Sequence, residues 1–213
     1  MVATAQSRDR GQVSKSRTLT MAFNPEDHSK LAVRDTTIPG FYIVDLVVNG
    51  DNRGWFKENY QKEKLEALGL PEFNIVQNNF SFNKERGVTR GLHAEPWEKF
   101  ISVANGSVLG AWVDLREGDS FGETLTLEIN PGVAVFVPRG VANGYQTLEE
   151  NVTYTYLVNE HWSPDAKYTF VNLFDPEIGI KWPIPQHNAI ISEKDARHPS
   201  LKELRARKGE ISG

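Results

Sequence analysis

Short apolar segments follow one another from residue 73 onward, and they constrain the fold more than any other feature of this chain. Clusters of Gly, Asn, Pro and Asp separate them at the spacing of antiparallel strands. Strands are expected at residues 73–82, 88–93, 99–104, 107–115, 124–129, 133–138, 151–158 and 168–173. Parallel strands need a long crossover, usually a helix, and these connections leave no room for one. The pattern therefore predicts an all-β antiparallel sandwich or barrel.

Before residue 73 the sequence predicts one more strand and one helix. Residues 41–48 form an apolar, strand-like run that ends in the turn-forming residues 49–54. Residues 61–70 are rich in helix formers, and Gly69 and Pro71 end that segment. The C-terminal segment SLKELRARKGE is charged and weakly helical. Helices are therefore expected to be few, short and peripheral.

The N-terminal residues differ from the rest of the chain. Residues 1–30 are polar and basic with almost no apolar periodicity, so a flexible or peripheral arm is expected there, one that could reach a partner subunit. Residues 31–213 are expected to form a single domain, because β-sandwiches and barrels can reach this length as one unit.

Composition narrows the classes of function. The formal net charge of −4 gives no excess of basic residues, so a nucleic-acid partner is not expected. No cysteine is present, which excludes disulfides and thiolate metal sites and favours a reducing compartment. The sequence has neither the apolar core of a signal peptide nor a run of membrane-spanning length. It thus predicts a cytoplasmic protein without a membrane partner.

Three side chains that suit an anionic ligand lie within one motif, RGLHAEPWEK at residues 90–99. His93 is the candidate catalytic base, and Arg90 and Lys99 are the candidates for contact with the substrate. The other histidines lie in polar or proline-marked stretches. A lone histidine on a strand is more often a hydrogen-bonded core or rim residue, and the pattern alone leaves that alternative open.

Tyrosines and one aspartate are candidates to work with His93. Tyr154 and Tyr156 lie two residues apart and so share one face of a strand. A neutral phenol beside an imidazole makes an acid–base pair, although both rings could equally be barrel filling. Asp175 follows the last strand and is a candidate to orient His93, but Asp-Pro is also a common start of a turn.

Weaker indications concern a nucleotide. Arg53 and Phe56 follow a tight turn, and an arginine with neighbouring aromatic rings suits a diphosphate and a stacked base. Gln77 and Asn79 share a strand face and could hydrogen-bond a nucleoside. Alternatively, Arg53 and Phe56 belong to a solvated turn, and Gln77 and Asn79 belong to a polar outer face of the sheet.

No catalytic metal or other cofactor is expected. The RGLHAEPWEK motif contains a single histidine, and the segment Val141-Ala142-Asn143-Gly144 contains none, so neighbouring strands do not supply a two-histidine triad. The chain also lacks a glycine-rich phosphate loop on a helix, a GxSxG elbow and a cysteine nucleophile.

Taken together, several ordered blocks resemble the dTDP-4-dehydrorhamnose 3,5-epimerases over residues 40–200. They are GDNRGWFKENY (50–60), QNNFSF (77–82), RGLHAEPWEK (90–99), VDLREGDSFG (113–122), FVPRGVANGYQTL (136–148), TYLVNEHWSP (155–164) and DPEIGIKWP (175–183). The resemblance implies a cupin-type jelly roll that works as a homodimer without metal or redox cofactor.

The resemblance also implies a reaction and a role for each candidate. The substrate would be dTDP-4-dehydro-6-deoxy-D-glucose, inverted at C3 and C5 through an enolate to give dTDP-4-dehydro-L-rhamnose. His93 would be the base, Asp175 its orienting partner, Tyr156 the acid, and Lys99 the cation at the C4 oxygen. The residues expected to hold the nucleotide and diphosphate are Arg53, Phe56, Glu58, Gln77, Asn79 and Arg90. Of these, Arg53 and Glu58 could come from a partner subunit.

Two positions depart from the common pattern of the family. Asn143 stands where a histidine is usual, and Trp162 where a tyrosine is usual. Both are expected to contact the substrate, Asn143 by a hydrogen bond and Trp162 by stacking. The departures leave room for an enzyme that inverts only C3 or only C5. A non-catalytic sugar-nucleotide binder is the more distant alternative, since a binder does not need a matched acid and base.

Overall fold

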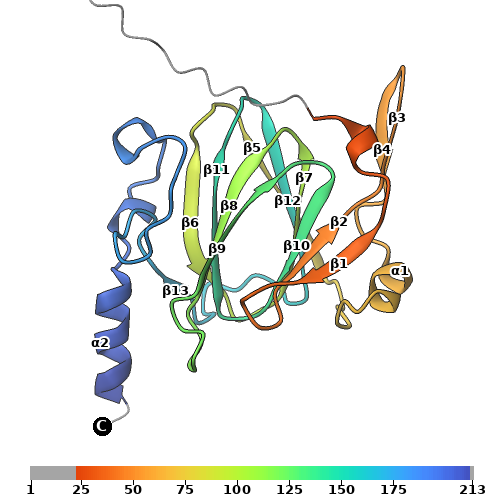
Figure 1. The fold of residues 1–213 in the computed structure, drawn as a ribbon. Helices are drawn as coiled ribbons and strands as arrows, with labels where there is room; N and C mark the ends of the chain where they lie inside the picture. The colour runs from red at the N-terminus through yellow and green to blue at the C-terminus, as the bar shows by residue number, and fades with distance from the viewer. Residues whose placement is uncertain (1–22, 212–213) are drawn as a thin grey trace, which may run out of the picture.

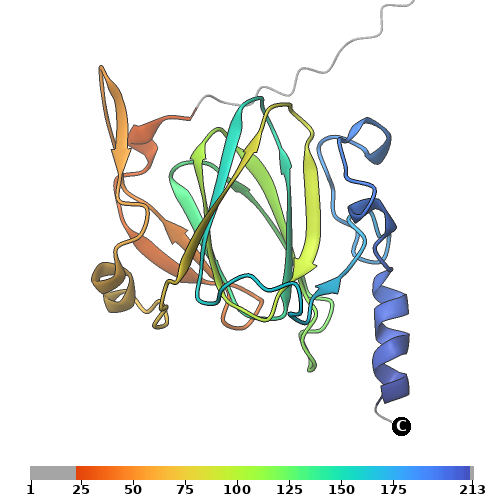
Figure 2. The same cartoon turned by 180° about the vertical axis from the view of Figure 1, so that it is seen from behind.

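Two antiparallel sheets that face each other form the centre of the molecule (Figures 1 and 2). The computed structural model describes residues 23–211. The six-stranded sheet contains, in spatial order, β1 (Ala32–Asp35), β2 (Tyr42–Asp45), β10 (Val133–Val137), β7 (Lys99–Asn105), β12 (Val152–Val158) and β5 (Gln77–Asn83). The five-stranded sheet contains β13 (Thr169–Phe170), β6 (Thr89–Ala94), β11 (Val141–Thr147), β8 (Val108–Asp114) and β9 (Thr124–Ile129).

The remaining elements lie outside these sheets. A separate hairpin consists of β3 (Val48–Asp51) and β4 (Gly54–Lys57). The helices are η1 (Pro25–Asp27), α1 (Lys62–Ala67), η2 (Gln186–Asn188), η3 (Asp195–Arg197) and α2 (Leu201–Ile211). The hairpin and α1 lie on the side of the six-stranded sheet, and α2 lies on the opposite side, next to β6 and β13 (Figure 1). The prediction of an all-β antiparallel jelly roll with few short helices is confirmed.

Alternation along the strands divides the side chains between the interior and the two outer faces. In β7, Ile101 and Val103 belong to the cluster between the sheets, whereas Phe100 packs outward with Leu65 of α1. A third apolar cluster lies outside the five-stranded sheet, where the C-terminal segment covers it through Leu201. Apolar clusters cover both outer faces of the sandwich. A buried polar side chain that points inward, such as Lys99, therefore indicates a functional site between the sheets.

Strand β11 is the main element that the sequence did not predict. Its Asn143-Gly144 pair resembles a turn, yet the segment pairs with both β6 and β8. The register against β6 shifts between Asn143 and Tyr145, and a Cβ at Gly144 would lie 2.7 Å from the Arg90 carbonyl oxygen. Gly144 therefore serves a close approach of two strands and not a turn. Strand β1 was also not expected, and the predicted run 41–48 is divided between β2 and the start of β3.

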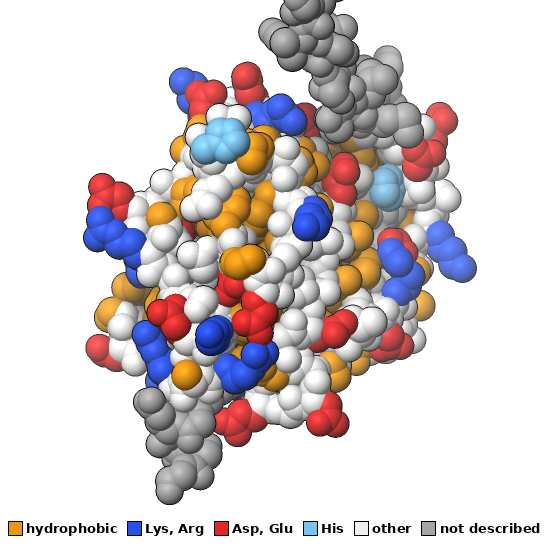
Figure 3. All heavy atoms as spheres, turned by 60° about the vertical axis from the view of Figure 1, so that its left-hand side comes forward, with side chains coloured by type: hydrophobic (Ala, Val, Ile, Leu, Met, Phe, Trp, Pro, Cys, Tyr) orange, Lys and Arg blue, Asp and Glu red, His pale blue; other side chains and the backbone are white. Residues whose placement is uncertain are grey.

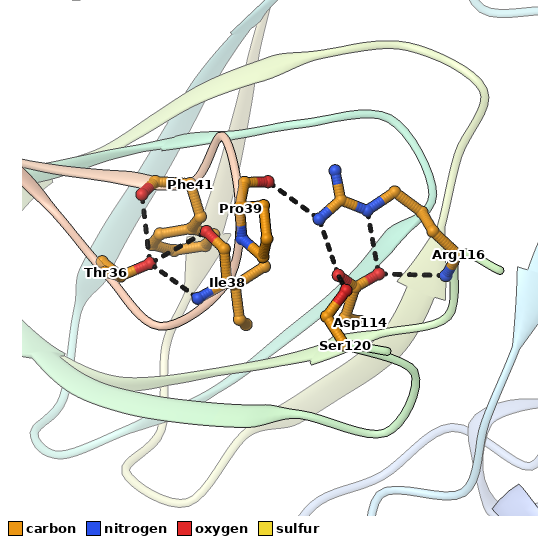
Figure 4. A network of polar contacts seen from close by, with 7 residues as sticks. All are labelled: Thr36, Ile38, Pro39, Phe41, Asp114, Arg116 and Ser120. Atoms are coloured by element: carbon orange, nitrogen blue, oxygen red, sulfur yellow. Dashed lines mark hydrogen bonds and ion pairs between the residues drawn. The ribbon is translucent and has the colours of Figure 1, made fainter. Parts of the chain in front are cut away.

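A buried carboxylate joins two loops at one end of the sandwich (Figure 4). Asp114 is fully buried and accepts hydrogen bonds from the Arg116 side chain and from Ser120 Oγ. Arg116 also donates to the Pro39 carbonyl oxygen at 2.8 Å, in the connection between β1 and β2. Burial would raise the pKa of Asp114, but the bonds from Arg116 and Ser120 hold it below its usual value. This network closes the sandwich without using a residue of the candidate site.

The face that carries the C-terminal segment has side chains of mixed type (Figure 3). On that face, hydrophobic side chains lie among acidic and basic ones, and neither charge covers a continuous area (Figure 3). Across residues 23–211, no helix has the length and apolar character needed to cross a membrane.

Candidate active site

One pocket between the two sheets collects side chains from five strands and from the segment that follows β6. His93 and Arg90 come from β6, Lys99 from β7, and Tyr154 and Tyr156 from β12. The complete lining is Ser81, Arg90, Gly91, His93, Glu95, Lys99, Asn143, Tyr145, Tyr154 and Tyr156. Alternation along β5, β7, β11 and β12 turns their polar groups in this lining inward, next to the apolar cluster between the sheets.

A buried carboxylate holds His93, and it belongs to Asp195 of η3. Asp195 Oδ1 lies 2.9 Å from His93 Nε2, and Oδ2 accepts from the Gly91 amide at 3.4 Å. Burial would raise the pKa of Asp195, but the bond and the charge of His93 and the Gly91 amide hold it below its usual value. The ionised carboxylate orients the imidazole with its proton on Nε2 and leaves Nδ1 with the lone pair that a base needs.

The prediction that Asp175 orients His93 is wrong. Asp175 Oδ2 accepts from the Leu201 amide at 2.5 Å, and Oδ1 accepts from the Glu177 amide at 2.8 Å. Its carboxylate thus satisfies a free amide at the start of α2, as an N-terminal cap does, and closes a local turn through the Glu177 amide. Asp195 was missed because it lies 102 residues from His93 in a charged segment with no strand pattern. Only its place as the last residue of a Ser-x-x-Asp sequence, in which Ser192 Oγ accepts from the Asp195 amide, marks it locally.

Lys99 is buried in the pocket wall and has polar partners on two sides. Its ammonium forms an ion pair with the Glu95 carboxylate and donates to Asn143 Oδ1 at 2.6 Å. It also lies 5.4 Å from the centre of the Tyr156 ring. Burial lowers the pKa of Lys99, and the charge and hydrogen bond of Glu95 oppose that shift. Glu95 was missed in the sequence, although its spacing of four residues before Lys99 within one motif could have indicated the pair.

The tyrosines enter the same interior, as their shared strand face predicted. Tyr145 was not predicted, because β11 was not predicted; its ring stacks on Tyr154 at 4.1 Å between centres, and its hydroxyl lies 3.0 Å from Ser81 Oγ. Burial raises the pKa of Tyr156, and the nearby Glu95 carboxylate raises it further. Tyr156 is therefore a neutral phenol near pH 7, which is the form that can give up a proton.

The residues predicted to hold a nucleotide divide into two groups. Gln77 and Asn79 lie on the inward face of β5 and line a second hollow that also contains Trp162, Glu95 and Tyr156. Because Glu95 and Tyr156 line both hollows, the two are adjacent. Gln77 Nε2 donates to Asn79 Oδ1 at 2.7 Å. Gln77 Oε1 accepts from the Trp162 amide at 3.3 Å, which leaves the indole 63% exposed.

The second group lies elsewhere in the chain. Arg53 and Phe56 belong to the β3–β4 hairpin and Glu58 follows it, and these residues line hollows that share no residue with the His93 pocket. Arg53 pairs with Asp51, and Glu58 pairs with Lys64 at 2.5 Å. The structure of one chain therefore does not bring these residues to His93.

In the described part of the chain, His93, Asp195 and His198 form the one group with a ligand set for a metal ion. Their ligand atoms lie within 4.8 Å of one another, and His198 Nε2 is 3.7 Å from Asp195 Oδ1. Burial and the neighbouring His93 lower the pKa of His198. Asp195 already holds His93 through Nε2, so an ion bound by these three residues would compete with the orientation of the base. Metal-independent chemistry remains a prediction.

Comparison with known proteins identifies the family. The family model for dTDP-4-dehydrorhamnose 3,5-epimerase matches residues 35–203. An RmlC homolog from Streptococcus pyogenes is 53% identical over 175 residues, which cover 79% of this chain and 88% of that protein. The dTDP-4-dehydrorhamnose 3,5-epimerase of Salmonella typhimurium is 33% identical over 180 residues, which cover 81% of this chain and 97% of that enzyme.

A solved structure supports the same assignment. RmlC from Streptococcus suis, in complex with dTDP-D-xylose, superposes with a TM-score of 0.78 at 53% identity and covers 82% of this chain and 93% of that chain. The region that the family model matches includes every strand of the two sheets except most of β1, and every residue of the His93 pocket. This chain belongs to the dTDP-4-dehydrorhamnose 3,5-epimerase family.

Proposed function

We propose that this protein epimerises dTDP-4-dehydro-6-deoxy-D-glucose at C3 and C5 to give dTDP-4-dehydro-L-rhamnose. The observation that carries the proposal is the convergence of the His93–Asp195 pair, the Lys99 ammonium and the neutral Tyr156 phenol on one pocket. These are a base, a cation for a developing oxyanion, and an acid. Membership of the epimerase family supports the same reaction.

His93 begins the reaction as the base. The C4 ketone of the substrate acidifies the hydrogens on C3 and C5, and His93 Nδ1 removes one of them. Asp195 stabilises the imidazolium that forms, because its carboxylate already accepts from Nε2. The electrons of the broken C–H bond move to the C4 oxygen, where the Lys99 ammonium offers a fixed positive charge to the enolate.

Tyr156 completes each inversion. Its phenol, or a water beside it, returns a proton to the opposite face of the carbon, so that the configuration inverts. The tyrosinate then recovers a proton from solvent, and His93 releases the one it took. A second round at the other carbon completes the conversion without a net change of oxidation state.

In this proposal the nucleoside occupies the second hollow, and the diphosphate lies toward Arg90 in the adjacent His93 pocket. Gln77 and Asn79 offer amide groups to the nucleoside, Trp162 offers an exposed ring for stacking, and Arg90 offers a charge for the diphosphate. Asn143 holds Lys99 through its side-chain oxygen, which is the role we assign to this departure from the family pattern. The sugar then reaches the His93 pocket across Glu95 and Tyr156, which the two hollows share.

A homodimer accounts for Arg53, Phe56 and Glu58. The hairpin that carries Arg53 and Phe56 projects from the molecule beside β1 and β2 (Figure 1), and Phe56 is 66% exposed. β5 is an end strand of the six-stranded sheet, and its outward Phe80 and Phe82 are 66% and 60% exposed. We assign the free edge of β5 to the partner's hairpin, which would bring Arg53 and Phe56 beside Gln77 and Asn79. A cytoplasmic location also stays part of the proposal, on the ground of the cysteine-free sequence.

Proton NMR of dTDP-4-dehydro-6-deoxy-D-glucose in D₂O tests the reaction directly. With the wild-type enzyme, deuterium should enter both C3 and C5. His93→Ala should slow both exchanges by roughly 10²-fold or more, since a positioned base contributes that much. His187→Ala, which changes an exposed histidine in η2, is the matched control and should leave the exchange unchanged.

Two other results of the NMR experiment would change the assignment of the reaction. Exchange at only one carbon would identify a mono-epimerase and would make Asn143 and Trp162 the first positions to change. Binding of the nucleotide without any exchange would show that the proposed reaction is wrong.

A further inference from the structure

Glu95 lies where the two hollows of the site meet, and the reaction described above gives it no task. We propose that Glu95 is a positioning residue that keeps Lys99 as an ammonium ion and Tyr156 as a neutral phenol, so that both are in the form that epimerisation requires. This inference deepens the proposed function and rests on it.

The position of Glu95 follows from the strand that precedes it. Glu95 lies two residues after His93, immediately beyond β6, and lines the same pocket. Its carboxylate forms a contact ion pair with Lys99 at the first position of β7. The two side chains are only 14% and 6% exposed, so water contributes little to the balance between them. The pair is thus a built part of the pocket wall and not a solvated surface bridge.

An ammonium ion buried at this place needs a negative partner. Removing a cation from water is costly unless a counter-charge and hydrogen bonds replace the lost hydration. Among the described residues that line either hollow, Glu95 is the sole carboxylate. The other groups around the pair are neutral or cationic: Asn143, Tyr154, Tyr156, Tyr168, His93 and Arg90. Glu95 is therefore the carboxylate in contact with Lys99 and the main source of the negative charge that keeps it protonated. The other carboxylate near the pocket, Asp195, is bound to His93 and to the Gly91 amide.

The same carboxylate acts on the tyrosine. Burial raises the pKa of Tyr156, and the charge of Glu95 raises it further. An acid in this reaction must hold its proton until the enolate has formed. One carboxylate thus favours the protonated state of both groups, and its loss should displace both titrations to lower pH.

Burial and the Glu95 carboxylate act on the pKa of Lys99 in opposite directions. Burial lowers the pKa of its ammonium, and Glu95 opposes that shift. Activity that needs the ammonium is present below this pKa and is lost as the pH rises through it. Glu95→Gln preserves the shape of the side chain but removes the charge, so the alkaline limb of the kcat profile should move to lower pH. On the alkaline side, kcat should fall about tenfold for each unit by which the pKa of the essential group drops.

The experiment measures deuterium exchange and kcat against pH for four proteins. Glu95→Gln should approach the wild-type rate at the acid end of the profile and fall away early as the pH rises. Glu95→Asp keeps the charge and should keep an alkaline limb near that of the wild type. Glu98→Gln is the matched control, because Glu98 pairs with Asn159 and Arg139 outside both hollows and its loss should not displace the limb.

The outcomes separate this inference from the function on which it rests. A wild-type enzyme that exchanges no deuterium at any pH would overturn the proposed function. A wild-type enzyme that exchanges, with an alkaline limb that Glu95→Gln leaves in place, would overturn the role of Glu95 alone. Inactivity of Glu95→Gln at every pH would also overturn it, since the ammonium should survive at acid pH without the carboxylate.

Discussion

The two aspartates considered for His93 differ in what their oxygens hold. Asp195 uses one oxygen for the imidazole and the other for the Gly91 amide, so its carboxylate cannot rotate without losing a bond. Asp175 uses one oxygen for the Leu201 amide at the start of α2 and the other for the Glu177 amide in its own loop. The first arrangement orients a base, and the second anchors a helix.

Substitution by asparagine should separate these two roles. Asp195→Asn removes the charge that stabilises the imidazolium, so kcat should fall by roughly 10²–10⁴-fold with little effect on KM. Asp175→Asn should largely keep kcat and lower the free energy of unfolding by about 1–2 kcal/mol through the weakened cap. Kinetics and urea unfolding of both variants provide the measurement. A larger loss of kcat in Asp175→Asn than in Asp195→Asn would contradict the assignment.

Most of the pocket could be predicted from the sequence because strands have a simple side-chain period. Tyr154 and Tyr156 were expected on one face, and the structure brings both to the pocket with His93 and Lys99. Asp195 could not be predicted in the same way, because a loop and a 3₁₀ helix carry it to β6 and no period links distant segments. Glu95 was hidden for a different reason: an i,i+4 ion pair beside a strand is usually a surface feature.

Secondary structure could not be predicted from the sequence where one residue type can serve two purposes. Glycine next to asparagine usually marks a turn, but Gly144 allows β11 to approach β6 closely. Because strand β11 was not predicted, Tyr145 was not recognised as a candidate site residue. Helix α1 was easier to predict, because its local signals agree with its structure. The Gln61 side chain accepts from the Lys64 amide at 2.6 Å, and Leu65 is the buried residue of the helix.

The β3–β4 hairpin is attached to the sandwich by a half-buried lysine, Lys57. Lys57 Nζ donates to the carbonyl oxygens of Val103 and Pro131, both at 2.9 Å. Burial lowers the pKa of Lys57 to about 8. A neutral amine still has two N–H groups, so it can serve both carbonyls after it loses its proton.

Stability should therefore depend on pH through Lys57 in a defined direction. Between about pH 8 and the ordinary lysine pKa of 10.5, the unfolded chain binds a proton that the folded chain does not. The free energy of unfolding should rise with pH in this window, by up to about 1.4 kcal/mol per pH unit. Urea unfolding at several pH values, with Lys57→Met as the reference, isolates this group. Parallel pH curves for the two proteins would show that Lys57 does not titrate there.

For the whole molecule, segments far apart in sequence complete the site. The C-terminal segment crosses the outside of the five-stranded sheet, packs Leu173 and Leu201 there, and brings Asp195 to β6. On the opposite side, the hairpin holds its candidate residues away from the pocket of its own chain (Figure 1). The pocket of a single chain thus contains all the residues proposed for proton transfer but lacks some of those proposed to bind the nucleotide. For this reason the proposal requires a second copy of the chain.

Mixing two inactive variants tests that requirement. If the hairpin serves the partner's site, an Arg53→Ala chain paired with a His93→Ala chain forms one intact site and one doubly altered site. Random pairing in a twofold dimer then restores about a quarter of all sites, so co-refolded mixtures should recover a corresponding share of kcat. His93→Ala mixed with Asp195→Asn is the control and should recover nothing, because one chain supplies both residues to one pocket. If the first mixture stays as inactive as its components, the hairpin does not act in trans.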